Sequence, residues 1–91
     1  MQDQIIDAVM ARRLYADATK AHVQFAWIVM QDLPDHPGKF IARLATEHPT
    51  IYVLEAATLA EIQEMLPPGL ERSERQPVDP PEVVEIWFSA S

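Results

Sequence analysis

Two histidines, His22 and His48, stand where a metal site or an acid–base site could form in this 91-residue chain. If Met30 pairs with Lys39 in an antiparallel hairpin, His22 lies opposite Glu47 and close to His48. Two imidazoles and one carboxylate can bind zinc or a similar ion, and they can also transfer protons. His22, Glu47 and His48 are therefore candidate residues for a metal site or an acid–base enzyme. The alternative is that the histidines are surface residues at strand ends.

The rest of the chain offers little for catalysis or cofactor binding. His36 lies in the loop of the same hairpin, roughly 27 Å of extended chain from His48, so these two cannot share a metal. The only serines lie in a proline-rich segment and at the C-terminus, and the only glycines, Gly38 and Gly69, form no phosphate-binding loop. We therefore assign no catalytic or cofactor-binding residue, expect no cofactor, and favour a non-enzymatic protein over an enzyme.

The chain is acidic, and its charge is unevenly distributed. Fourteen acidic and seven basic residues give a formal net charge of −7, and residues 1–43 are neutral, so the whole excess lies in residues 44–91. This balance argues against direct binding of nucleic acid phosphates. It allows an acidic face for a basic protein partner, or an inhibitor that mimics nucleic acid. A solvated surface would have the same composition.

The sequence also indicates a cytoplasmic protein. Its longest apolar run, residues 25–30, is far shorter than the ~20 residues that cross a bilayer, so we expect no membrane contact. Asp3 and Asp7 stand where a signal peptide would carry basic residues. Because there is no cysteine, the chain has no disulfide.

Hydrophobic spacing predicts a single small α+β domain over residues 1–91. Residues 1–20 are predicted to form an amphipathic helix, because apolar residues recur every four positions from Ile6. Asp3 is the predicted N-cap of this helix. Residues 22–66 are predicted as a β-β-β-α unit, whose helix begins at a capping box of Thr58 and Glu61. A proline-rich connector (67–81) and a last strand (82–89) follow. The predicted order is α-β-β-β-α-β, with two helices on an antiparallel sheet of about four strands.

Apolar residues on both faces of the predicted strands indicate a contact between subunits. Trp27, Val83 and Trp87 are the candidate interface residues, since a chain this short has difficulty covering so much apolar surface. The alternative is that these residues form the core of the monomer.

Residues 23–66 resemble HicB-type antitoxins, in which a small sheet likewise precedes a helix that begins as Thr58-Leu59-Ala60-Glu61 does here. The resemblance implies a small sheet covered by a helix, and no DNA-binding extension follows it. Residues 27–88 are also similar to small uncharacterised bacterial proteins of unknown function, which implies a bacterial origin and no particular activity.

These observations predict a non-enzymatic protein-interaction or regulatory module that forms a homodimer or other homo-oligomer. We expect it to bind a protein partner through its acidic half or an exposed apolar strand, with no direct contact to nucleic acid. Two alternatives are a small metal-dependent or acid–base enzyme using His22, Glu47 and His48, and an acidic inhibitor or nucleic-acid mimic.

Overall fold

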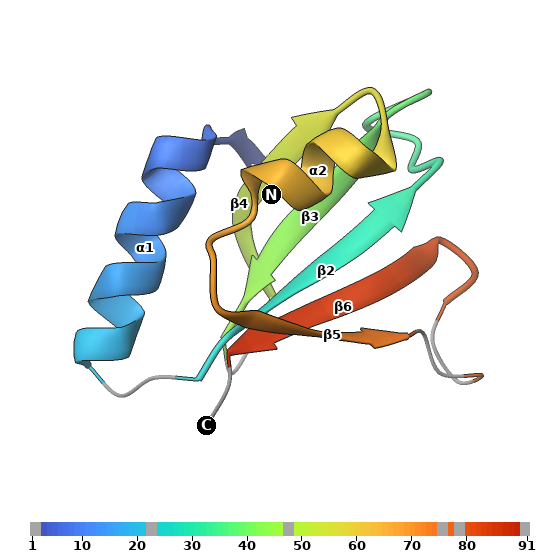
Figure 1. Ribbon diagram of the computed structural model, residues 1–91. Coiled ribbons are helices and arrows are strands. Elements are labelled where there is room, and N and C mark those ends of the chain that lie inside the picture. Colours follow the sequence, from blue (N-terminus) through green and yellow to red (C-terminus); the bar gives the residue numbers. More distant parts are fainter. Residues whose placement is uncertain (1–2, 22–23, 47–48, 75–76, 78–79, 90–91) are drawn as a thin grey trace.

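The computed structural model describes residues 3–21, 24–46, 49–74, 77 and 80–89. Within these residues the chain forms one six-stranded sheet and two helices (Figure 1). In chain order the elements are β1 (Gln4–Ile5), α1 (Ala8–Lys20), β2 (Ala26–Gln31), β3 (Phe40–Ala45), β4 (Pro49–Ala56), α2 (Leu59–Met65), β5 (Leu70–Glu74) and β6 (Val83–Ser89). Neither helix of this described part is long and apolar enough to span a membrane.

The sheet is mixed and has the strand order β1-β4-β3-β2-β6-β5. The predicted α+β class with two helices is confirmed, but the antiparallel sheet of about four strands is wrong in two respects. β1 runs parallel to β4, with Gln4 beside Tyr52, and there are six strands rather than four. The observed order is β-α-β-β-β-α-β-β. The extra strands are β1, which has two residues, and β5, which is a polar edge strand, so neither carries the apolar alternation that identifies a strand.

Helix α1 begins later than predicted because Asp7, not Asp3, is its N-cap. The carboxylate of Asp7 accepts a hydrogen bond from the backbone N–H of Met10 at 2.8 Å. Asp3 lies in the segment before β1, and its carboxylate has other partners. The helix buries Ala11, while Met10, predicted on its apolar stripe, is 39% exposed.

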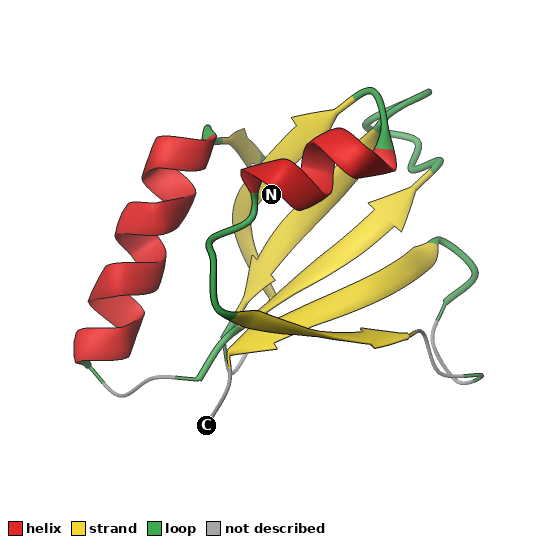
Figure 2. Ribbon diagram, viewed as in Figure 1, coloured by secondary structure: helices red, strands yellow, loops and turns green. Residues whose placement is uncertain are grey.

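Both helices pack on the same face of the sheet, and the hydrophobic core lies between them and the strands (Figure 2). The residues at its centre come from β2, β3, β4 and α2 and are almost fully buried: Trp27, Val29, Leu44, Leu54 and Ile62. Leu14 and Tyr15 of α1 pack against the margin of this core. The core therefore joins α1 and α2 to one side of the sheet.

The pairing of β2 with β3 differs from the predicted register. Met30 lies opposite Ile41, whereas the hairpin prediction placed it opposite Lys39. Gln31 pairs with Phe40, so the loop spans residues 32–39 and lies one position further along the chain than a pairing of Met30 with Lys39 implies. Because a shift of two residues keeps every side chain on its original face, the predicted faces of both strands survive.

The β2–β3 loop is compact and folds back on the sheet. Asp32 (φ 58°) and Gly38 (φ 71°) both adopt the left-handed conformation that reverses the chain. Between them, the backbone N–H of His36 donates to the carbonyl of Leu33 at 3.0 Å, and the N–H of Lys39 donates to the carbonyl of His36 at 3.2 Å. These turns fix the position of His36.

Helix α2 begins at the predicted cap, since the Thr58 hydroxyl accepts from the backbone N–H of Glu61 at 3.2 Å. After α2 the chain turns at Gly69 (φ 87°) and forms β5, which pairs with β6. The segment predicted as a connector over 67–81 therefore contains an edge strand. This is possible because β5 falls in the part of the segment that has no proline.

The face of the sheet that turns away from the helices is also apolar. Side chains alternate along β2 and β6, so the neighbours of the buried Trp27 point to this second face. Ile28 lies opposite Ile86, and Ala26 lies opposite Phe88. Together with Met30 these half-buried residues form what we term the apolar strip: Ala26, Ile28, Met30, Ile86 and Phe88. No described helix covers it.

Candidate functional site

Four polar side chains meet on the helix-free face of the sheet, and we term them the His36 cluster: Asp3, His36, Arg43 and Glu55. Each comes from a different segment. Asp3 precedes β1, His36 lies in the β2–β3 loop, Arg43 lies on β3 and Glu55 lies on β4. The β3–β4 register places Arg43 and Glu55 on the same face, and the parallel pairing of β1 with β4 brings Asp3 beside them.

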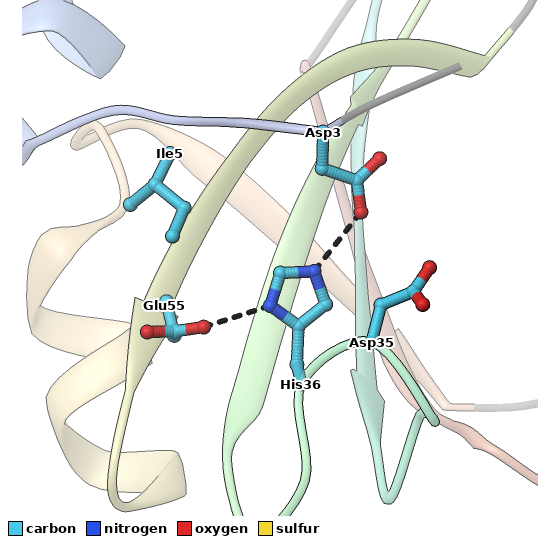
Figure 3. Close-up of a pocket in the computed structure, with 5 residues that line it drawn as sticks. All are labelled: Asp3, Ile5, Asp35, His36 and Glu55. Carbon is cyan, nitrogen blue, oxygen red and sulfur yellow. Dashed lines mark hydrogen bonds and ion pairs between the residues drawn. The ribbon is translucent and has the colours of Figure 1, made fainter.

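His36 is the centre of the cluster (Figure 3), and only 6% of its side chain is exposed. Its Nδ1 lies 2.7 Å from Glu55 Oε2, and its Nε2 lies 2.9 Å from Asp3 Oδ2. A neutral imidazole has one N–H, whereas the protonated ring has two and can donate to both carboxylates. The geometry therefore fits an imidazolium ion held between two carboxylates.

Arg43 holds the other side of Asp3. Its Nη1 donates to Asp3 Oδ1 at 2.8 Å, and its Nη2 donates to Asp3 Oδ2 at 2.9 Å, which is a bidentate ion pair. Nη1 also donates to the carbonyl oxygen of Thr50 at 2.8 Å. The Thr50 hydroxyl in turn donates to the carbonyl of Leu44 at 2.6 Å, so the guanidinium is fixed against the ends of β3 and β4.

These contacts change the acidity of two groups in the cluster. The hydrogen bonds from Arg43, followed by the bond from His36, lower the pKa of Asp3 from 3.8 to about 2, although burial acts in the opposite direction. The hydrogen bonds to Asp3 and then to Glu55 raise the pKa of His36 above its usual 6.5, again against the effect of burial. Both pKa shifts favour the charged forms, which agrees with the ion pairs that Asp3 and His36 form.

A cavity of about 390 Å³ opens beside the cluster and is lined by Asp3, Ile5, Asp35, His36 and Glu55 (Figure 3). Because carboxylates occupy both ring nitrogens, His36 has no lone pair available to accept a proton from a substrate in this cavity. Among the described residues, no group of three or more His, Cys, Asp or Glu side chains is arranged to hold a metal ion. The contacts of the cluster are cross-links between the N-terminal segment, the β2–β3 loop, β3 and β4.

The cross-links shield one end of the helix-free face. Ile41 and Val53 share this face with Arg43 and Glu55, and both are completely buried although no described helix lies over them. His36 ties the β2–β3 loop to β4, and Asp3 ties the N-terminal segment to β3. The His36 cluster therefore closes this end of the face and leaves the apolar strip on β2 and β6 as its half-buried remainder.

No protein family, curated protein or solved structure matches this chain. The resemblances to HicB-type antitoxins and to small bacterial proteins stay predictions.

The predicted metal or acid–base residues, His22, Glu47 and His48, lie outside the described residues. The site that they would form therefore stays a prediction.

The three predicted interface residues lie in different places. Trp27 has no exposed surface and sits in the core on the helix side, where its Nε1 has no hydrogen-bond partner. Trp87 lies next to it across the β2–β6 ladder and is half-buried. Val83 is 6% exposed and lies opposite Met30. Their role at an interface stays a prediction.

A buried carboxylate, that of Glu85 on β6, lies on the helix side of the sheet and is 4% exposed. Its Oε1 accepts hydrogen bonds from Gln63 Nε2 at 2.8 Å and Trp87 Nε1 at 2.9 Å. Its Oε2 accepts from Arg72 Nη1 at 3.3 Å. With three donors, this carboxylate is satisfied, and it connects α2 to β5 and β6.

Sequence reasoning missed the whole His36 cluster. Its contacts join residues 19, 33 and 40 positions apart, so no local spacing reveals them. Two signals were present: Arg43 and Glu55 interrupt strands that are otherwise apolar. A charged side chain on an apolar strand needs a partner of opposite charge. The candidate partners were the charged residues in the predicted loops and near the termini.

Proposed function

We propose that this protein is a non-enzymatic interaction module that forms a homodimer, with the apolar strip as the contact between its two copies. The observation that carries the proposal is the position of the strip, which lies on the side of the sheet that neither helix covers. Apolar side chains gathered on one open face are typical of a protein–protein contact.

The pattern across the strip favours a second copy as its occupant. Ile28 and Ile86 lie side by side at its centre, and one flank carries Arg43 on β3 while the other carries Glu71 on β5. A two-fold axis between β2 and β6, parallel to the strands, would place β3 of one copy over β5 of the other. Each Ile28 would then lie over Ile86 of the second copy, so the apolar centre of the strip is complementary to itself.

Packing two such faces together would produce a β-sandwich, with the apolar strips buried between its two sheets. Packed sheets lie about 10 Å apart, a distance that apolar side chains of the size of Ile, Met and Phe fill. The energetic gain is the removal of these half-exposed side chains from water, at about 25 cal/mol for each Å². The helix side of each copy would remain available for other contacts.

The test is the oligomeric state of the wild type and of an Ile86→Lys variant, measured by light scattering after size exclusion at about 50 µM. We expect a dimer for the wild type and a monomer for Ile86→Lys, because the variant places two lysines at the centre of the contact. Val9→Lys is the matched control: Val9 is 71% exposed on α1, so the same new charge there should leave the dimer intact.

A monomeric wild type, or an Ile86→Lys variant that remains dimeric, would overturn the proposal. Circular dichroism establishes that each variant is folded. If Ile86→Lys does not fold, Phe88→Ser takes its place, since Phe88 lies near the end of β6 and a serine there introduces no charge.

A further inference from the structure

Helix α1 and the segment that follows α2 lie beside each other on the helix side of the sheet (Figure 1). An apolar groove lies between them, on the opposite side of the molecule from the apolar strip. Its volume is about 470 Å³. One wall consists of Tyr15, Ala16 and Thr19 of α1, and the other consists of Pro67 and Pro68.

Both walls are held in place before any partner arrives. The ring of Tyr15 packs edge-on against the buried Phe25, with 5.0 Å between ring centres. Its hydroxyl lies 3.4 Å from the position that a Cβ would take on Gly69, so the turn after the two prolines touches α1. Since proline also restricts its own backbone, little conformational entropy would be lost when a ligand binds here.

Two basic side chains mark the ends of the groove. Arg12 and Lys20 line it eight residues apart on α1, which is about 12 Å along the helix axis. Neither forms an ion pair with another described residue. With Arg13, α1 carries three of the seven basic residues in a chain whose net charge is −7. An acidic partner would be repelled by most of the surface and attracted here.

We propose that this groove binds an acidic amphipathic helix of a partner protein. One apolar side chain of that helix would enter the groove between Tyr15 and the two prolines, and two carboxylates about two turns apart would meet Arg12 and Lys20. The required pattern is Glu or Asp, an apolar residue four positions later, and Glu or Asp four positions after that, since these three positions lie on one face of a helix.

A second copy of this chain fits the groove less well. Its acidic helix, α2, carries Glu61 and Glu64 only three residues apart, about 4.5 Å along the axis, which is too close to reach both Arg12 and Lys20. The groove is also separate from the apolar strip. The proposed homodimer and the proposed helix site can therefore fail independently of each other.

The test uses a capped, alanine-based peptide of about 16 residues with Glu, Leu and Glu at positions i, i+4 and i+8. It is titrated to about 2 mM into the ¹⁵N-labelled protein, and amide chemical shifts are followed. We expect saturable shifts at Tyr15, Ala16, Thr19 and Gly69 and none at the apolar strip. A peptide with Lys in place of both Glu residues, and one with Ala in place of Leu, should bind at least about five-fold more weakly.

The matched variants are Arg12→Ser/Lys20→Ser and Arg13→Ser. The double variant should weaken the Glu-Leu-Glu peptide about five-fold or more, and Arg13→Ser, which removes a charge outside the groove, should change the affinity by less than about two-fold. Three results would overturn the proposal: no shifts in the groove at the highest peptide concentration, equal effects of the two variants, or loss of a wild-type dimer in the double variant, which would make the groove a contact between copies.

Discussion

Substitution of Asp3 by asparagine tests the role of the His36 cluster, because Asp3 is the one residue that contacts both of its cations. The variant keeps the size of the side chain but removes its charge. The neutral amide could not form the ion pairs with Arg43 or His36 that now lie at 2.8 and 2.9 Å. We expect the folded state to lose stability while the overall fold remains.

The expected loss follows from the acidity of Asp3. A pKa lowered from 3.8 to about 2 corresponds to about 2.5 kcal/mol of stability at neutral pH. Because 17% of the Asp3 side chain is exposed, solvent screening reduces this contribution, and we expect a loss of about 1 to 2 kcal/mol. That is a large fraction of the stability of a domain of this size.

The contributions of Asp3 and His36 to stability depend on pH in opposite directions. The lowered pKa of Asp3 means that its contribution is present above about pH 4 and is lost as the pH falls through about 2. The raised pKa of His36 means that its contribution is present below about pH 6.5 and is lost as the pH rises through the higher value in the folded protein. Stabilisation by the cluster is therefore greatest between about pH 4 and pH 6.5.

Urea denaturation followed by tryptophan fluorescence at about pH 2.5, 5.5 and 9.5 measures these effects. Asp3→Asn should differ most from the wild type at the middle pH, and the difference should shrink at both extremes. Asp35→Asn is the control, since Asp35 lines the same cavity without a hydrogen bond to His36. Equal stability of Asp3→Asn and wild type at pH 5.5, or an equal loss in Asp35→Asn, would refute the assigned role.

Three further substitutions test the rest of the fold. Glu85→Leu should cost about 1 to 3 kcal/mol in urea denaturation and alter the fluorescence of Trp87, because the indole N–H loses its acceptor; an unchanged stability and spectrum would count against the buried network. Thr58→Ala should cost about 1 kcal/mol by loss of the α2 cap, whereas Thr58→Ser should be nearly neutral; equal losses would show that the hydroxyl is not the stabilising group. Gly69→Ala should cost about 1 kcal/mol because φ is 87° and the hydroxyl of Tyr15 lies close to the new methyl group; a thermal melt that matches the wild type would contradict the positive φ.

The elements with strong local signals were predictable. The Thr58 capping box marks the start of α2, and the alternating apolar residues of β2, β3 and β6 mark central strands of the sheet. Alternation also indicated that β2 is apolar on both faces, which is why the core and the apolar strip can share one strand. These features depend on neighbours in the sequence, so the sequence alone carries them.

The features that depend on distant contacts were not predictable. β1 exists because Gln4 and Ile5 lie beside β4, and two residues without a partner carry no strand pattern. Asp3 was predicted as the N-cap of the first helix, but its carboxylate pairs instead with Arg43, 40 residues away, which no local pattern reveals. His36 lay in a predicted loop with nothing local to distinguish it from a surface histidine, and only the folded sheet brings Glu55 to its ring.

Sedimentation equilibrium of the unmodified chain tests the proposed homodimer most directly, because it needs no substitution and no partner. Over a range from about 1 to 500 µM the weight-average mass should rise from that of one chain toward twice that value and fit a monomer–dimer equilibrium. A mass that stays at one chain over the whole range would contradict the apolar strip as a contact between copies.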